Sequence, residues 1–383
     1  MENKTVSVII PIFNAEPYLE QCLDSLLAQD YSALEILCIN DGSNDNSLAT
    51  MQNYAKLDQR IRVIDKKNEG YGASCNRGIE EASGHWISII EPDDWIEQGM
   101  YSSMLNYAQN FDVEPDIIKT PYWRIINPDT PEQVKINCTY RSRIPEGVLL
   151  SIGEATQLLE HHPSIWSALY RRDYLMEKNI RFKPIPGAGW ADNPWLIATL
   201  CQTDRIVFLN KPFYCYREET IEKTRNFALK NTYVPLERWN DMQDILDRLN
   251  VKDPRILRSH IRRGFIYLSG IYSFVDINDP ELRERATQMC ERMDPDLVLS
   301  DNEIPPFDRR LFAELMGLPE PKISQFSFNA SLLGKGLYFV ANTGLRYSAK
   351  MTLLTLRREL HKNWQTQQYG EELYEEETEA KQQ

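Results

Sequence analysis

Three acidic residues follow a short apolar run within the first hundred residues. Residues 87–90 contain three isoleucines, and Glu91, Asp93 and Asp94 come soon after them. This pattern predicts a buried strand that delivers carboxylates into a turn. Carboxylates at a strand end suit Mg²⁺ or Mn²⁺, which prefer oxygen ligands, and open α/β sheets bind ligands at that end. The stretch indicates either a metal site, centred on Asp93, that holds a diphosphate, or an ordinary acidic turn, and alone it favours the turn.

The segments around this run alternate between strand and helix patterns. Apolar, β-branched runs predict strands at residues 6–11, 35–39, 61–64 and 85–90, and helical spacing of apolar residues fills the intervals. This alternation predicts an α/β fold, a Rossmann-like nucleotide-binding domain with a mainly parallel central sheet. Later signals predict strands at residues 116–119, 205–209 and 212–217, a helix at residues 194–200, and a long excursion over the cleft at residues 120–148, which are rich in Pro, Asn and Thr.

The last third of the chain has a helical pattern. Beyond about residue 225, apolar residues recur at helical spacing at residues 234–249, 254–274 and 280–293. Residues 331–364 are basic with interspersed apolar residues, which predicts either a helix lying on an anionic membrane surface or an ordinary packing helix. We expect an α/β domain at residues 1–225, a helical extension at residues 226–365 and an acidic mobile tail at residues 366–383.

Composition and charge narrow the class of protein. The length of 383 residues favours two domains, or one domain with an extension. A net charge of −13 argues against a nucleic-acid partner. We expect no membrane-spanning helix, because the sequence has no run of about 20 uncharged apolar residues. We also expect no signal peptide, because residues 1–5 lead straight into a strand. The seven cysteines show neither metal nor disulfide spacing, which fits a reducing cytoplasm.

Four motifs together resemble the family 2 glycosyltransferases of the GT-A fold. They are residues 6–14, residues 39–47, residues 68–78 and the acidic cluster before Trp95. Each motif alone is weak, but their order and spacing are specific. The resemblance covers residues 5 to about 100 strongly and residues 164–217 moderately, and it says nothing of residues after about 230. It implies that residues 1–225 form a GT-A catalytic domain.

The resemblance implies transfer of a sugar from a nucleotide-diphosphate-sugar donor to an acceptor hydroxyl, with inversion at the anomeric carbon. The resemblance implies Mn²⁺ or Mg²⁺ as the cofactor, and it favours a UDP-sugar as the donor. By family habit, the acceptor would be a glycan or lipid-linked glycan of a surface polysaccharide or lipopolysaccharide. The enzyme would work in the cytoplasm, with residues 331–364 as a candidate contact to the inner face of the membrane.

On the donor side, the resemblance implies nucleotide contacts from Pro11, Phe13, Asn14, Asp41, Asn76 and Glu91. Asp41 matches the carboxylate that accepts a hydrogen bond from the base, although a turn aspartate is the simpler alternative. Glu91 stands where the family usually has aspartate, and the glutamate side chain is longer by one carbon. Asp93 matches the second acid of the family's acidic motif and is the implied metal ligand. Asp94 is a further candidate ligand, and the sequence does not decide between the two.

On the acceptor side, Asp192 matches the acid that takes the proton of the acceptor hydroxyl as general base. The family places a glutamate before it, and this chain has Ala191 there. If that glutamate were the catalytic acid, Asp192 would only cap a helix. Trp190 and Trp195 flank this position, and aromatic faces suit stacking against sugar rings, although core packing explains Trp195 equally well.

Two other classes of protein remain open at this point. A nucleotidyltransferase also combines an α/β nucleotide fold with acidic metal ligands, but such enzymes usually carry a glycine- and arginine-rich loop after the first strand, and residues 11–14 do not. A catalytically inactive nucleotide- or carbohydrate-binding module on the same fold is the second alternative, because Glu91 and Ala191 depart from the family pattern.

Overall fold

The computed structural model describes residues 4–138, 140, 143–187, 189–218, 232–323 and 325–343. The chain divides into two compact units, Met1–Phe328 and Asn329–Gln383. The predicted domain boundary at residues 225 and 226 and the predicted acidic tail at residues 366–383 lie outside the described residues.

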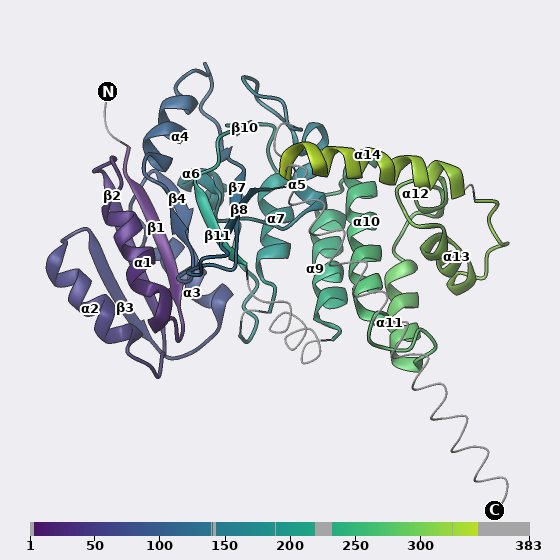
Figure 1. The fold of residues 1–383 in the computed structure, drawn as a ribbon, viewed down its shortest axis with the longest axis horizontal. Coiled ribbons are helices and arrows are strands. Elements are labelled where there is room, and N and C mark those ends of the chain that lie inside the picture. Colours follow the sequence, from purple (N-terminus) through teal and green to yellow (C-terminus); the bar gives the residue numbers. More distant parts are fainter. Residues whose placement is uncertain are drawn as a thin grey trace, which may run out of the picture. The chain divides into compact units, whose positions relative to one another are not determined.

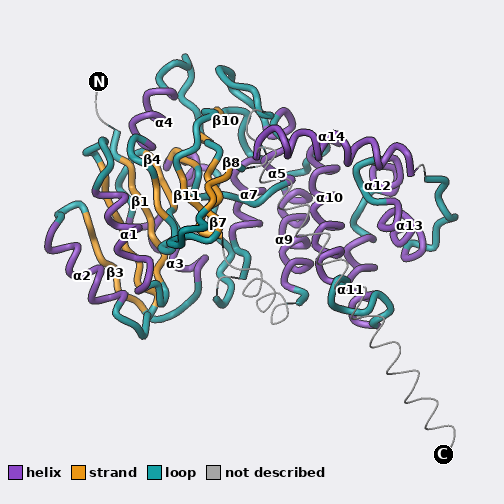
Figure 2. Tube along the Cα trace, in the orientation of Figure 1, coloured by secondary structure: helices purple, strands orange, loops and turns teal. Residues whose placement is uncertain are grey.

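A seven-stranded sheet forms the centre of the first unit (Figures 1 and 2). Its strands are β1 (Val6–Ile12), β2 (Leu34–Asp41), β3 (Ile61–Lys66), β4 (Trp86–Ile89), β6 (Ile117–Lys119), β9 (Ala168–Arg171) and β10 (Ile206–Phe208). The order is β10-β6-β9-β4-β1-β2-β3, and every pairing is parallel except the two that β9 makes. β1 is buried along its whole length, which explains its unbroken apolar sequence. The predicted α/β fold with a mainly parallel sheet is confirmed.

Helices α1 (Glu16–Leu27), α2 (Ser47–Leu57) and α3 (Tyr71–Glu81) connect the first strands, as the sequence predicts. α3 packs directly on β1 because it carries Gly78 at the contact. A Cβ atom at Gly78 would lie 2.3 Å from Cγ2 of Ile9. This close packing brings the start of α3 to the carboxyl edge of the sheet. The shorter helices are α4 (Met100–Ala108), η1 (Ile152–Glu154), α5 (Gln157–Glu160), α6 (Arg172–Glu177) and α7 (Asp192–Leu200).

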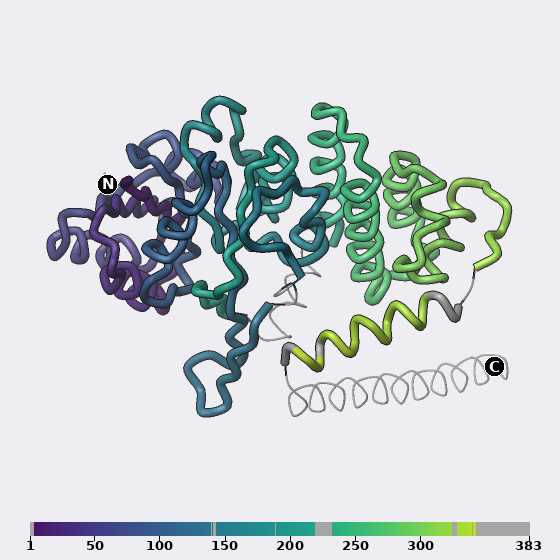
Figure 3. Tube along the Cα trace, turned by 90° about the horizontal axis from the view of Figure 1, so that it is seen from above, coloured from purple at the N-terminus to yellow at the C-terminus, as the bar shows by residue number. Residues whose placement is uncertain are grey.

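A second, four-stranded sheet lies beyond the acidic turn. It contains β5 (Trp95–Ile96), β11 (Tyr214–Glu218), β7 (Tyr122–Ile126) and β8 (Val134–Asn137), in that order. The long excursion predicted at residues 120–148 was therefore wrong in part, because β7 and β8 pair antiparallel within it. Their turn extends away from the rest of the unit (Figure 3). Residues 90–94 connect β4 of the first sheet with β5 of the second, so the acidic turn lies where the two sheets meet.

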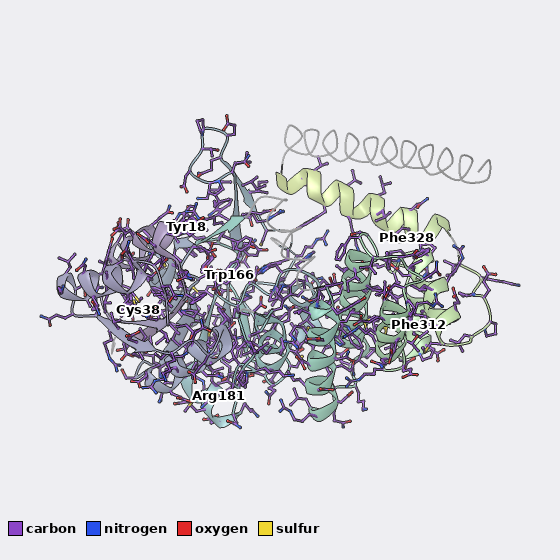
Figure 4. The ribbon with its side chains drawn as sticks, turned by 90° about the horizontal axis from the view of Figure 1, so that it is seen from below. Tyr18, Cys38, Trp166, Arg181, Phe312 and Phe328 are labelled. Carbon is purple, nitrogen blue, oxygen red and sulfur yellow. The ribbon has the colours of Figure 1, made fainter. Side chains whose placement is uncertain are left out.

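Among the described residues 232–323, the helices after β11 are α9 (Val234–Arg248), α10 (Pro254–Ile271), α11 (Pro280–Cys290), α12 (Pro295–Ser300) and α13 (Pro306–Leu315). The first three match the predicted helices, whereas α12 and α13 were not predicted. α10, α11 and α12 each begin with proline after an aspartate whose carboxylate accepts backbone N–H bonds. Their own core includes Trp239, Phe265, Met289 and Phe312, and Figure 4 labels Phe312 among these helices.

α14 (Gln325–Thr343) contains the start of the segment for which the sequence predicts a basic amphipathic helix. Leu332, Leu333 and Leu337 are 48%, 67% and 65% exposed. The basic residues beyond position 343 lie outside the described residues. None of the helices in the described part of the chain is long and apolar enough to cross a membrane.

Candidate active site

The acidic turn after β4 holds one aspartate that is committed to the fold. Asp94 is 1% exposed. Its Oδ1 accepts the backbone N–H of Arg217 at 2.6 Å, and its Oδ2 accepts the hydroxyl of Tyr214 at 2.7 Å. Burial raises the pKa of Asp94 and the Asp93 carboxylate adds to this, while the two hydrogen bonds oppose it. Asp94 thus fastens the acidic turn to β11, and Asp93, which is partly exposed, is the acid better placed to meet a ligand.

Arg217 on β11 supports the turn from the other side. Its Nε donates to the carbonyl oxygen of Asp93 at 2.8 Å, and its Nη2 donates to Oε1 of Gln21 at 2.5 Å. The guanidinium also forms an ion pair with Asp129 and lies over the ring of Tyr18, 4.8 Å from its centroid. Because the side chain is 7% exposed, these contacts hold the backbone of Asp93 in one place.

Glu91, the first acid of the turn, contacts α3. Its Oε1 accepts the hydroxyl of Tyr71 at 2.5 Å. Burial raises the pKa of Glu91 to about 8, the Tyr71 hydrogen bond opposes this, and the charges of Asp93 and Asp192 raise it further. At neutral pH the Glu91 carboxyl therefore carries a proton in much of the population and is a hydrogen-bond donor as well as an acceptor.

Asp41, at the end of β2, holds the glycine-containing loop before α3. Its Oδ1 accepts Lys66 Nζ and the N–H of Glu69, and its Oδ2 accepts the N–H of Gly70 at 2.9 Å. Burial alone would raise the pKa of Asp41, but these donors outweigh it and lower the pKa. A carboxylate offers about four acceptor positions, so roughly one remains for a nucleotide base. Gly70 has φ +93°, and a Cβ there would lie 2.4 Å from the carbonyl of Ile185.

Three other residues predicted to contact the nucleotide lie at the end of β1 or directly after it. Pro11 is buried, whereas the Phe13 ring is 48% exposed and available for stacking. Asn14 has φ +51°, its N–H donates to Ser43 Oγ at 3.1 Å, and its Oδ1 accepts the N–H of Asn44 at 2.8 Å. Asn14 therefore joins the loops that follow β1 and β2.

Asn76, also predicted to contact the donor, is used within the fold. Its Oδ1 accepts the N–H of Phe182 at 2.8 Å, and its Nδ2 donates to the carbonyl of Phe182 at 2.9 Å. This double hydrogen bond ties α3 to the segment that leads to α7. Asn76 thus has a positioning role, and its predicted contact with the donor stays a prediction.

Asp192 is the first residue of α7, where free backbone N–H groups favour a carboxylate. Burial raises its pKa to about 6, while the positive charge of Arg263 opposes the rise. The segment that leads to α7 lies against the start of α3, because the N–H of Tyr71 donates to the carbonyl oxygen of Gly187 at 2.9 Å, and the Tyr71 hydroxyl in turn bonds Glu91. Ala191 is 1% exposed, so the position where the family has glutamate is packed in the interior here.

The two tryptophans beside Asp192 differ in their surroundings. Trp195 is fully buried and stacks on Phe182, with 4.1 Å between ring centroids and 7° between planes. The prediction that Trp195 stacks against a sugar is wrong, because the fold already covers its ring. Trp190 is partly exposed, has φ +56°, and contacts Tyr267 edge to face at 5.4 Å. Trp190 remains a candidate for sugar stacking.

Several site residues were not predicted. Tyr71 belongs to a motif, but its bond to Glu91 depends on the packing of α3. Arg263 and Tyr267 lie on α10, about seventy positions after Asp192, and only the fold brings them together. No group of three His, Cys, Asp or Glu side chains in the described part of the chain is arranged to hold a metal ion by itself.

The fold and the acids at its carboxyl edge define a GT-A glycosyltransferase domain, and comparisons with known proteins agree. Residues 7–177 match the model of glycosyl transferase family 2. The chain is 32% identical over 221 residues to EpsJ, an uncharacterized glycosyltransferase of Bacillus subtilis (strain 168), and this alignment covers 56% of the chain and 61% of EpsJ. It is 28% identical over 254 residues to YibD, an uncharacterized glycosyltransferase of Escherichia coli (strain K12), covering 65% of the chain and 73% of YibD.

Solved structures extend the likeness to the fold of the helical part. A crystal structure of residues 1–349 of S. aureus TarS matches with a TM-score of 0.65 and 16% identity, over 89% of this chain and 92% of that one. The same fragment in complex with UDP-GlcNAc matches with a TM-score of 0.61 and 17% identity, over the same 89% and 92%. The chain thus resembles the family 2 glycosyltransferases over residues 7–177, shares the fold of TarS, and spans 61% of the length of EpsJ.

Proposed function

We propose that this protein transfers a sugar from a nucleotide-diphosphate-sugar donor to a hydroxyl group of a glycan or lipid-linked glycan, with inversion at the anomeric carbon. One observation carries the proposal: Tyr71, whose hydroxyl bonds Glu91 in the acidic turn after β4, donates its backbone N–H to the carbonyl oxygen of Gly187 at 2.9 Å, on the segment that leads to Asp192 at the start of α7. A base for the acceptor and the acids of the donor side thus meet at the carboxyl edge of the sheet, where α/β folds bind nucleotides.

Asp93 is the residue that we propose to hold Mn²⁺ or Mg²⁺. The surroundings fit a cation, because burial and the negative charge of Asp93 raise the pKa of Glu91 and Asp94, and a bound cation relieves such repulsion. Asp94 is committed to Tyr214 and Arg217, so a single carboxylate would share the ion with diphosphate oxygens and water, as is common for Mg²⁺. The ion would supply Lewis-acid neutralisation of the departing diphosphate.

The side chain of Asp192 takes the proton from the acceptor hydroxyl in this proposal. The freed oxygen attacks the anomeric carbon on the face opposite the diphosphate, one C–O bond forms, and the bond to the diphosphate breaks with its electron pair. Tyr71 and Glu91 lie on the donor side of the same site, and the exposed ring of Phe13 is available to the nucleotide base. Trp190, two residues before Asp192, is partly exposed and held edge to face by Tyr267, so its ring is the one that we propose to stack on the acceptor sugar.

UDP-sugars are the donors to test first, because TarS, which shares the fold, has been solved with UDP-GlcNAc. The assay measures release of nucleoside diphosphate from UDP-, GDP- and CDP-sugars with added acceptor glycans, with Mn²⁺ and with EDTA. We expect turnover with one nucleotide class, loss of turnover in EDTA, and at least a hundredfold loss in Asp192→Asn. Donor binding without turnover under every condition would contradict the enzymatic proposal and support a binding module instead.

We further propose that α14 contacts an anionic membrane surface. Its exposed leucines at positions 332, 333 and 337 flank Lys335 in the sequence, and residues 344–364 carry five Lys or Arg residues against one Glu. The test is co-sedimentation with vesicles of phosphatidylcholine, with and without phosphatidylglycerol. We expect binding only to the anionic vesicles and its loss in Leu333→Glu combined with Leu337→Glu. Equal recovery of wild type and double variant with anionic vesicles would contradict this contact.

A further inference from the structure

Arg263 reaches from α10 to the start of the active-site helix α7. Its side chain is 5% exposed. Nε donates to the carbonyl of Leu159 at 2.9 Å, and Nη2 donates to the carbonyl of His161 at 2.6 Å. Nη1 donates to Oδ1 of Asn193 at 2.9 Å and to the hydroxyl oxygen of Tyr267 at 3.0 Å. These four partners are neutral, so the positive charge of the guanidinium is left to act on the nearby acid of α7.

The contacts of Arg263 determine which way the amide of Asn193 points. An arginine side chain only donates hydrogen bonds, so the atom of Asn193 that faces it must be the oxygen. Tyr267 donates to the same Oδ1 at 2.7 Å. The NH₂ group of Asn193 is thereby turned toward Asp192, and Nδ2 lies 3.2 Å from Oδ1 of Asp192. The hydrogen bonds from α10 therefore orient Asn193 so that its NH₂ group donates to the carboxylate of Asp192.

We propose that Arg263, acting through Asn193, is a positioning residue that orients the Asp192 side chain and keeps it in the carboxylate form needed for a general base. This inference rests on the proposed function of Asp192. It assigns the helices after β11 a part in the active site, because α10 supplies the charge and the orientation that the sheet domain lacks at this point.

The electrostatic surroundings of Asp192 agree with this role. Burial raises the pKa of Asp192, and Arg263 is the largest influence that lowers it, ahead of the hydrogen bonds at the start of α7. The other titratable groups that feel or exert charge here are Glu91 after β4, Tyr71 and Cys75 on α3, Tyr216 on β11 and Tyr267 on α10. Arg263 is the cation that acts most strongly on Asp192, and another described cation, Arg238 on α9, donates from Nη1 to the carbonyl oxygen of Gly189 at 3.3 Å.

Two variants separate the charge of Arg263 from its packing. Arg263→Gln removes the charge. Asn193→Asp keeps a partner for Arg263, which supports folding, but replaces the donor toward Asp192 with a second carboxylate. Arg263→Lys is the conservative rescue. Arg262→Gln is the matched control, since Arg262 is adjacent on α10 and pairs instead with Asp301, at 2.7 Å, and Glu160, at 3.0 Å.

The first readout is the pKa of Asp192, measured by carboxyl ¹³C NMR and assigned with Asp192→Asn. We expect an upward shift of about one unit in Arg263→Gln and Asn193→Asp, a smaller one in Arg263→Lys, and none in Arg262→Gln. The second readout is the pH profile of kcat/KM, whose acid limb should move upward by the same amount, with activity recovering at high pH. An unchanged Asp192 pKa in both variants, or a loss of rate that is uniform across pH, would overturn the inference.

The two readouts also distinguish the inference from the function on which it rests. Wild-type protein without turnover, but with an Asp192 pKa that shifts as expected, would refute the proposed base and retain the positioning contact. Normal wild-type turnover that falls in Asp192→Asn, combined with an unshifted pKa in the Arg263 and Asn193 variants, would retain the base and refute the role of Arg263.

Discussion

Replacement of Asp94 should damage the fold, whereas replacement of Asp93 should damage ligand binding. Asp94→Ala removes two buried hydrogen bonds, at 2.6 and 2.7 Å, and leaves the N–H of Arg217 without its acceptor. With about 1 to 1.5 kcal/mol for each bond, the free energy of unfolding should fall by about 3 kcal/mol. For a unit of this size, that loss corresponds to roughly 5 °C in Tm. Asp93→Ala removes a partly exposed carboxylate, so its Tm should stay within about 1 °C of wild type.

The assay is thermal unfolding with and without UDP and Mn²⁺ for wild type, Asp93→Ala, Asp94→Ala and Asp94→Asn. Asp94→Asn is the matched control, since its amide oxygen can still accept the N–H of Arg217 and its NH₂ can donate to Tyr214. We expect the free energy of unfolding of Asp94→Asn to fall by only about 1 kcal/mol, and UDP with Mn²⁺ to raise its Tm as in wild type. A stable Asp94→Ala that no longer responds to Mn²⁺ and UDP, beside an Asp93→Ala that does respond, would show that the roles of the two acids are reversed.

Three more predictions concern single residues. Trp195→Ala removes a ring from the core and should lower the free energy of unfolding by about 4 kcal/mol, which calorimetry measures. Trp190→Ala should leave Tm nearly unchanged and raise the KM for the acceptor, which steady-state kinetics measures. Because burial raises the pKa of Asp192 to about 6 and the base is the carboxylate, wild-type kcat/KM should rise with pH through about 6. A flat profile from pH 5 to 8 would contradict this. Burial lowers the pKa of Lys119 from 10.5 to about 7. Between pH 7 and 10.5, Lys119 is therefore protonated in the unfolded chain and neutral in the folded one. Stability should therefore rise with pH across that window, by up to on the order of 5 kcal/mol, and urea titrations of Lys119→Met should lack this component.

The sequence predicts the first sheet well because its signals are local. The apolar run of β1 reflects burial on both faces, and the turns after β2 and β4 carry polar residues at fixed positions. β7 gives no such signal, because its parallel partner β11 lies about ninety residues later in the chain. An isolated short strand in a Pro- and Asn-rich stretch cannot be distinguished from a loop until that partner is known.

The same distinction applies to the site. Asp192 could be predicted from the family resemblance, and its place at the start of a helix agrees, since the free N–H groups there favour a carboxylate. The contacts of Asn76 and Trp195 could not be predicted, because both are made with Phe182. Its backbone bonds Asn76 and its ring stacks on Trp195 only in the folded chain. Arg263 has no motif of any kind in the sequence. Its role follows from the packing of α10 beside α5 and α7, which no local pattern encodes.

We propose a donor site for a nucleotide diphosphate at the acidic turn, with the ion held by Asp93. Isothermal titration of UDP into wild type, Asp93→Ala and Asp192→Asn, with Mn²⁺ and with EDTA, tests it most directly. We predict binding by wild type and Asp192→Asn with Mn²⁺ only, and at least a tenfold weaker binding by Asp93→Ala. Binding that is equal in EDTA and in Asp93→Ala, or a failure of UDP, GDP and CDP to bind at all, would contradict the claim.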